Sequence, residues 1–143
     1  MTLEELQQSV NKDFKLDDTE LDAESIKIPL LHNKYLQHFN KFSLLLKKAE
    51  YDHKTMTRDK WEYYTGKMTN DDLKKYGWDP FPFTLKSDIN TYLDADEDIN
   101  KYLASKMMHE EVVEVCNAIL KELNNRTWEL RSFIDWEKFI QGV

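Results

Sequence analysis

Apolar residues recur every seven positions along the stretch from Leu21 to Gly66. Since this stretch contains one proline, Pro29, and no glycine before its end, it predicts a long helix that is either kinked at Pro29 or starts afresh there. A seven-residue repeat keeps one seam of a helix facing a partner helix, as in coiled coils. The residues of this seam are Ile28, Tyr35, Phe42, Ala49, Met56 and Tyr63.

The seam has two interpretations. A chain of 143 residues can hardly cover so long a stripe alone, which favours packing of Ile28, Tyr35 and Phe42 against another subunit. The alternative is that helices from the C-terminal part of the chain fold back and cover it.

The rest of the chain also has a helical pattern. A short helix is expected over about residues 3–12, followed by an acidic segment. Residues 68–93 predict an irregular connector with one short helix ending at Gly77, then an extended segment over 78–83 that includes Phe83, because each proline there disfavours helix in the preceding residue.

The C-terminal part is expected to form two shorter helices. Asp94 and Glu97 have capping-box spacing and predict a helix to about Leu123, and Asn124-Asn125 is expected to separate it from a last helix. The prediction is therefore one all-α domain over 1–143. It consists of an acidic segment 1–26, a basic long helix 27–67, a connector 68–93 and C-terminal helices 94–143.

Composition narrows the function class. Three Gly and three Pro provide too few turns for an all-β fold, and no apolar run reaches the roughly 18 residues of a membrane span. The single cysteine, Cys116, has apolar neighbours and is expected to fill the core in a reducing compartment. A cytoplasmic protein is expected.

The net charge of −7 conceals a basic block. Residues 27–67 carry 9 basic and 4 acidic side chains, whereas residues 1–26 carry 2 and 8, and residues 68–100 carry 3 and 8. Because local potential decides where a polyanion docks, the block permits nucleic-acid binding; the simpler interpretation is an ordinary charged helix surface.

Within this block, aromatic rings are interleaved with cations on one helix face. Lys47, Tyr51, Lys54, Arg58 and Trp61 are spaced four, three, four and three residues apart. Cations that follow the phosphates and rings that stack on unpaired bases are typical of single-strand binding. The expected nucleic-acid site extends to the helix end, with Lys60, Tyr64 and Lys67 as further members.

We find no pattern typical of an enzyme. The histidines and Cys116 lack metal-ligand spacing, and Asp94-x-Asp96-x-Asp98 lacks the glycine and glutamate of a calcium loop. No phosphate-binding glycine loop or activated nucleophile is present either. The sequence therefore predicts a protein without catalytic residues, metal or cofactor.

The segment from Arg58 to Lys67, Arg-Asp-Lys-Trp-Glu-Tyr-Tyr-Thr-Gly-Lys, resembles a segment of the UvsY family, the recombination mediators of T-even-type bacteriophages. Leu93-Asp94-Ala95-Asp96 and the ending with Arg126, Trp136, Phe139 and Gly142 are also similar to that family. Trp61 stands where the family has an aliphatic residue.

The resemblance implies a protein of the infected bacterial host's cytoplasm that acts in phage homologous recombination and repair. It implies a ring, expected to be heptameric, that binds single-stranded DNA and helps a RecA-like recombinase replace the single-strand-binding protein. It carries DNA binding over to Arg58 and Lys60, and it ties assembly to the C-terminal region, here Trp128, Trp136 and Phe139.

Three alternatives remain at this point. A structural coiled-coil assembly protein would explain the heptads without nucleic-acid binding. A small metal-dependent nuclease would use the acidic cluster at 94–98. An inhibitor or adaptor of a host protein is the third.

Overall fold

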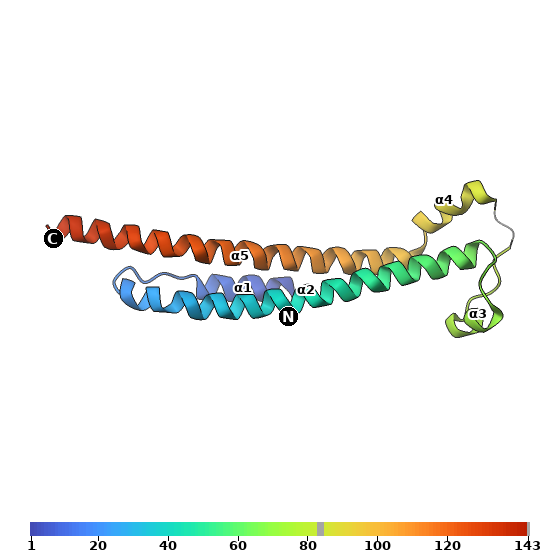
Figure 1. The fold of residues 1–143 in the computed structure, drawn as a ribbon, viewed down its shortest axis with the longest axis horizontal. Coiled ribbons are helices and arrows are strands. Elements are labelled where there is room, and N and C mark those ends of the chain that lie inside the picture. The colour runs from blue at the N-terminus through green and yellow to red at the C-terminus, as the bar shows by residue number, and fades with distance from the viewer. Residues whose placement is uncertain (83–84, 143) are drawn as a thin grey trace. The chain divides into compact units, whose positions relative to one another are not determined.

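The chain folds into helices only, over the residues that the structure describes. The computed structural model describes residues 1–82 and 85–142, so Phe83 of the expected extended segment lies outside the described residues. The helices are α1 (Leu3–Asp13), α2 (Leu21–Tyr64), α3 (Asn70–Tyr76), a 3-10 turn (Lys86–Asp88), α4 (Ile89–Asp94) and α5 (Glu97–Gln141) (Figure 1). The predicted all-α class is confirmed.

Helix α2 is continuous through Pro29, so a fresh start at this residue is wrong. Pro29 lacks the N–H that would bond the carbonyl of Ser25, yet α2 includes it among its 44 residues. Both Pro29 and its neighbour Leu30 are exposed. The Ser25 carbonyl, which loses its helical hydrogen bond, lies near the start of α2. The helix remains continuous because the packing of its later turns stabilises it.

The expected break at Asn124-Asn125 is also wrong. Helix α5 is a single helix of 45 residues that runs through both asparagines. Asparagine disfavours a helix interior by well under 1 kcal/mol relative to alanine. Leu123 and Leu130, on either side, are almost completely buried, and their packing outweighs this small cost.

Helix α5 begins two residues later than the capping-box spacing predicts. Asp94 ends α4, and the residue that caps α5 is Asp96, whose Oδ1 accepts the N–H of Ile99 at 3.0 Å. This places the Asp96 carboxylate at the helix start, where the helix dipole favours a negative charge.

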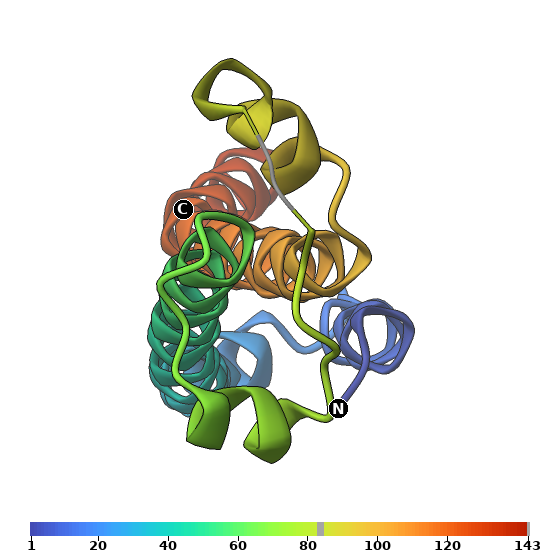
Figure 2. The ribbon, with the colours of Figure 1, turned by 90° about the vertical axis from the view of Figure 1, so that its right-hand side faces the viewer.

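The described residues form two compact units, and α2 and α5 contribute a segment to each. Unit 1 comprises 1–43 and 111–142, and α1 lies beside its α2 and α5 segments (Figures 1 and 2). Its core contains one residue from α1, two from α2 and four from α5: Leu6, Tyr35, Phe42, Val112, Cys116, Ile119 and Leu123.

This core corrects the expectation that Tyr35 and Phe42 meet another subunit. Tyr35 is fully buried and Phe42 is 4% exposed within one chain, because α1 and α5 cover this part of the seam. The alternative interpretation, that the C-terminal part folds back over the seam, holds for these residues.

Polar contacts fasten α1 in unit 1. The hydroxyl of Tyr35 donates to Asp13 at 2.8 Å, and Lys34 Nζ lies 2.6 Å from the same carboxylate. Burial, together with the Asp13 carboxylate, raises the pKa of Tyr35 to about 12. At the end of α1, Arg126 donates to the carbonyl of Phe14 at 2.9 Å. The acidic first segment is therefore an integral part of unit 1.

Unit 2 comprises residues 44–110, and its apolar interior includes Ala49, Met56, Ile89 and Ile99. Helices α3 and α4 lie on different sides of the end of α2 (Figures 1 and 2). A group of rings from the end of α2, the connector and α4 packs at centroid distances of 4.9 to 5.6 Å: Tyr63, Tyr64, Trp78, Phe81 and Tyr92. This group holds the connector against α2.

No helix among the described residues is long and apolar enough to cross a membrane.

Candidate nucleic-acid interface

The predicted row of cations and rings is an exposed face of α2 in unit 2. We call its members, all of them exposed, the stripe: Lys47, Tyr51, Lys54, Arg58 and Trp61. Ala49 and Met56 of the same helix are buried. At 3.6 residues per turn, the stripe lies roughly opposite these two residues. The helix thus packs one face and presents the other.

The cations of the stripe differ in their partners. Within residues 1–82 and 85–142, neither Lys47 nor Lys54 lies within ion-pair distance of a carboxylate. Arg58 lies 3.0 Å from Asp59, and the hydrogen bond to this carboxylate raises the pKa of Arg58 above its ordinary value. Since Arg58 is exposed, its other N–H groups stay open to solvent.

Lys60 does not belong to the exposed surface, which corrects its place in the expected site. Its side chain is 8% exposed, and its Nζ lies 3.2 Å from Asp96 and 2.9 Å from Asp98. The same ammonium lies 3.9 Å from the centroid of the Trp78 ring. The cation therefore joins α2 to the start of α5 and to the connector. Its ammonium group is already paired with two carboxylates and is not available to a phosphate.

Tyr64 is likewise part of the packing of unit 2. Its ring is half-buried among other rings, and its hydroxyl donates to Asp96 at 2.5 Å. Burial of Asp96 alone would raise the pKa of this carboxyl, but the bonds from Tyr64, the Ile99 N–H and Lys60 outweigh burial and hold the pKa below its usual 3.8. Asp96 therefore stays ionised beside Lys60 at neutral pH.

The stripe ends at a cavity beside Trp61. Gly66 has φ +74°, a left-handed conformation that ends α2 and turns the chain back. The turn brings Lys67 Nζ to 4.4 Å from the centroid of the Trp61 ring. A cavity of about 360 Å³, which we call the Trp61 pocket, is lined by Trp61, Thr65, Lys67, Lys86, Ile89 and Asn90.

Four members of this pocket, Thr65, Lys86, Ile89 and Asn90, are absent from the site predicted from the sequence. Lys86 and Asn90 come from the 3-10 turn and α4, which follow the connector. No periodic pattern relates them to Trp61, because the path of the connector, rather than a helix repeat, decides their position. The sequence offers no signal that would have found them.

The acidic cluster at 94–98 serves the packing of unit 2. Asp96 and Asp98 bind Lys60. In the described part of the chain, no group of three or more His, Cys, Asp or Glu side chains is placed to hold a metal ion.

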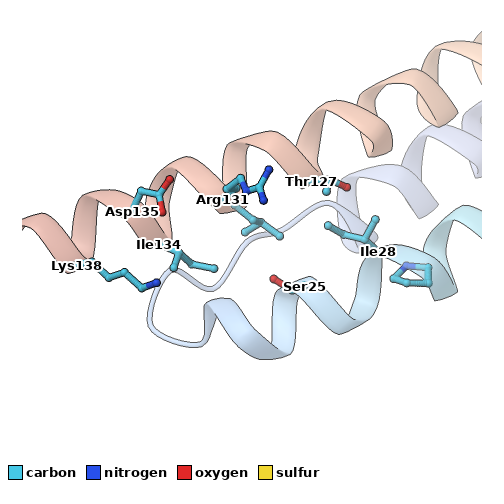
Figure 3. Close-up of a pocket in the computed structure, with 9 residues that line it drawn as sticks. Ser25, Ile28, Thr127, Arg131, Ile134, Asp135 and Lys138 are labelled. Carbon is cyan, nitrogen blue, oxygen red and sulfur yellow. The ribbon is translucent and has the colours of Figure 1, made fainter. Parts of the chain in front are cut away.

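A second candidate surface lies at the end of α5 in unit 1. Trp128, Trp136 and Phe139 are 67%, 60% and 74% exposed, although each is a large apolar side chain. A cavity of about 540 Å³ lies between the first turns of α2 and the last turns of α5 (Figure 3), and none of these three side chains lines it. The half-buried Ile28 lines this cavity together with Ile134. Such a surface is typical of a protein contact.

Known proteins resemble the chain over almost its whole length. The family model "Recombination, repair and ssDNA binding protein UvsY" matches residues 9–143. The recombination protein uvsY of Enterobacteria phage T4 is 25% identical over 142 residues, which cover 99% of each chain.

Solved structures have the same fold. Two crystal structures of the bacteriophage T4 recombination mediator protein UvsY, in lattice types II and IV, match with TM-scores of 0.86 and 0.84 at 24% and 23% identity. The matches cover 99% and 97% of this chain and 98% and 99% of those chains. The chain belongs to the UvsY family of recombination and repair proteins.

Proposed function

We propose that this protein is a recombination mediator that binds single-stranded DNA through the stripe of unit 2. It would help a RecA-like recombinase take the place of the single-strand-binding protein in phage homologous recombination and repair, in the cytoplasm of the infected host. The observation that carries the proposal is the exposed face of α2, where three cations are interleaved with two exposed rings. Membership of a recombination and repair family supports it.

The chemistry of the stripe suits an unpaired strand. Lys47, Lys54 and Arg58 attract phosphates, and Tyr51 and Trp61 offer ring faces on which bases stack. In a duplex these base faces are already stacked, so the rings contribute only to single-strand binding. The preference for single strands should therefore depend on the two rings, and the salt dependence on the three cations.

One stripe alone binds weakly, because it offers only three cations. Assembly of several subunits presents the same face repeatedly to one flexible strand and raises avidity without new contacts. Each contact still exchanges rapidly with salt ions, which suits a mediator that must release the strand to the recombinase.

We propose that assembly into a ring, heptameric by the family resemblance, uses the end of α5. Trp128, Trp136 and Phe139 supply the exposed apolar area, and Ile28, which lines the cavity between α2 and α5, is a further proposed contact. Tyr35 and Phe42 are left out of this surface because they are buried within one chain. The proposed DNA site likewise omits Lys60 and Tyr64, because both side chains contact Asp96 within unit 2.

The test is fluorescence anisotropy of a labelled oligonucleotide, single- or double-stranded, titrated with protein over a salt series. We expect tighter single-strand binding, with a salt slope that decreases by about 0.7 for each phosphate that a variant no longer neutralises. Lys47→Ala and Lys54→Ala should each reduce the slope, whereas the exposed Lys121→Ala, on α5 in unit 1, serves as the matched control. Assembly without any DNA binding at low salt would contradict the proposal and favour a structural assembly protein.

A further inference from the structure

We infer that the Trp61 pocket binds one unpaired base together with a neighbouring phosphate of the strand. This inference rests on the proposed single-strand binding and names a site for it. The pocket combines an open indole ring with two lysine ammonium groups and one side-chain amide, from Trp61, Lys67, Lys86 and Asn90.

The ring is held in place and still accessible. Lys67 Nζ lies 4.4 Å from its centroid, a cation–π contact that restricts the side chain. Trp61 nevertheless remains 40% exposed, so ring surface is left on which a base can stack. Ile89, which is buried, adds an apolar wall to the pocket.

Among the described residues, the cations of the pocket have no acidic partner, in contrast to Lys60. In the part of the chain that the structure describes, neither Lys67 nor Lys86 lies within ion-pair distance of a carboxylate. Lys60, on the same helix as Trp61, is paired with Asp96 and Asp98. A phosphate beside Trp61 therefore meets two ammonium groups without first displacing an acidic side chain.

The amide completes a site for a nucleotide. Asn90 is exposed and lines the pocket, and its side chain offers both donors and an acceptor to the edge of a base. The volume of about 360 Å³ lies within the range of small-molecule sites. A cavity of this size can hold one base but no duplex.

Continuity with the stripe favours a nucleic-acid strand over an acidic peptide. Arg58 precedes Trp61 by three residues, about one helical turn, on the same exposed face. A strand that follows Lys54 and Arg58 with its phosphates therefore reaches Trp61 at the end of α2. An acidic peptide would use the cations but gain less from the indole ring.

The experiment measures the affinity of the whole protein for two labelled hexanucleotides. Both carry the same number of phosphates, but one consists of thymidine and the other of abasic residues. Wild type should bind the thymidine hexamer more tightly. We expect Trp61→Leu to lower this preference about tenfold, as the loss of one stacked base would, and to leave the affinity for the abasic hexamer unchanged. Trp61→Phe keeps a ring and should keep most of the preference.

The lysines should behave differently. Lys67→Ala together with Lys86→Ala should weaken both hexamers equally and reduce the salt slope by about 0.7, because the pocket then no longer neutralises its one phosphate. Lys121→Ala is the control. As an independent readout, 2-aminopurine in the hexamer should lose fluorescence when it stacks on wild type or Trp61→Phe, and lose much less with Trp61→Leu.

The outcomes separate this inference from the proposed function. If Trp61→Leu leaves the preference intact, or weakens both hexamers alike, the base site is refuted while single-strand binding by the stripe stands. Equally tight binding of a hexaglutamate peptide would identify a general polyanion site and also refute it. If wild type binds neither hexamer nor longer single strands at low salt, the inference and the proposed function both fail.

Discussion

Replacing Lys60 by alanine should lower the free energy of unfolding of unit 2, because the lysine neutralises a buried negative charge. The ammonium lies within 3.2 Å of Asp96 and of Asp98, and the Asp96 side chain is only 4% exposed. Lys60→Ala leaves this carboxylate without its cation, and it also removes the contact with the Trp78 ring. By contrast, Arg58→Ala removes an exposed cation whose partner Asp59 keeps a hydrogen bond from Tyr76.

The magnitude follows from what Asp96 retains. Breaking a buried ion pair by removing one partner costs about 3–5 kcal/mol. After Lys60→Ala, Asp96 still accepts bonds from the hydroxyl of Tyr64 and the N–H of Ile99, and Asp98 is half exposed and can be hydrated. We therefore expect the lower end, about 3 kcal/mol, which corresponds to roughly 10 °C or more in the melting temperature of a unit of this size.

The assay measures stability and DNA binding on the same samples. Thermal and urea unfolding, followed by circular dichroism at one protein concentration, should show a large loss for Lys60→Ala and almost none for Arg58→Ala or Lys54→Ala. Anisotropy at a temperature where all variants are folded should show the reverse order. Arg58→Ala and Lys54→Ala reduce the salt slope, and Lys60→Ala does not.

A charge-neutral rescue sharpens the test. Lys60→Met with Asp96→Asn removes both charges and keeps most of the volume, so the double variant should recover much of the stability lost in Lys60→Ala. The reasoning is refuted if Lys60→Ala unfolds like wild type and lowers the salt slope as much as Arg58→Ala. Lys60 would then be a free cation that binds DNA.

Three further outcomes are expected. Gly66→Ala places a side chain at φ +74°, which should destabilise the turn by about 1 kcal/mol. The altered turn should move Lys67 away from Trp61, and the resulting change in tryptophan emission can be measured by fluorescence. Burial and two nearby lysines lower the pKa of His38 below 6.5, so its contribution to the free energy of unfolding is complete above pH 6.5 and is lost as the pH falls below that value. The denaturant midpoint should therefore be lower at pH 5.5 than at pH 7.5, and His38→Gln should reduce this difference between the two midpoints. Leu6→Ala should cost about 2–5 kcal/mol in urea unfolding because Leu6 is fully buried, and a wild-type midpoint would show that α1 is not packed in unit 1.

The helical class and the buried seam could be predicted because both depend on periodicity. Tyr35, Phe42, Ala49 and Met56 are all buried, as the seven-residue repeat indicates. The repeat does not identify what covers the seam. In unit 1, α1 and α5 of the same chain cover it, and this depends on contacts between residues far apart in the sequence.

The helix boundaries in the C-terminal part were harder to predict because local propensities are weak. Two asparagines suggest a break, but the burial of Leu123 and Leu130 in unit 1 outweighs their cost. Similarly, a capping-box spacing points to Asp94, whereas the side chain that caps α5 by accepting the N–H of Ile99 is Asp96. Tertiary packing determines these helix boundaries, and it cannot be deduced from the local pattern of a single sequence.

The same limit separates the two basic residues that the family resemblance treats as a pair. Arg58 and Lys60 are two residues apart and therefore point about 200° from each other on a helix. One side of α2 at this level faces solvent, and the other faces Asp96, Asp98 and Trp78. A cation at the first position is available to a strand, whereas a cation at the second holds the scaffold that positions it. Changing both together would therefore mix a loss of binding with a loss of folding, and only the single variants distinguish the two contributions.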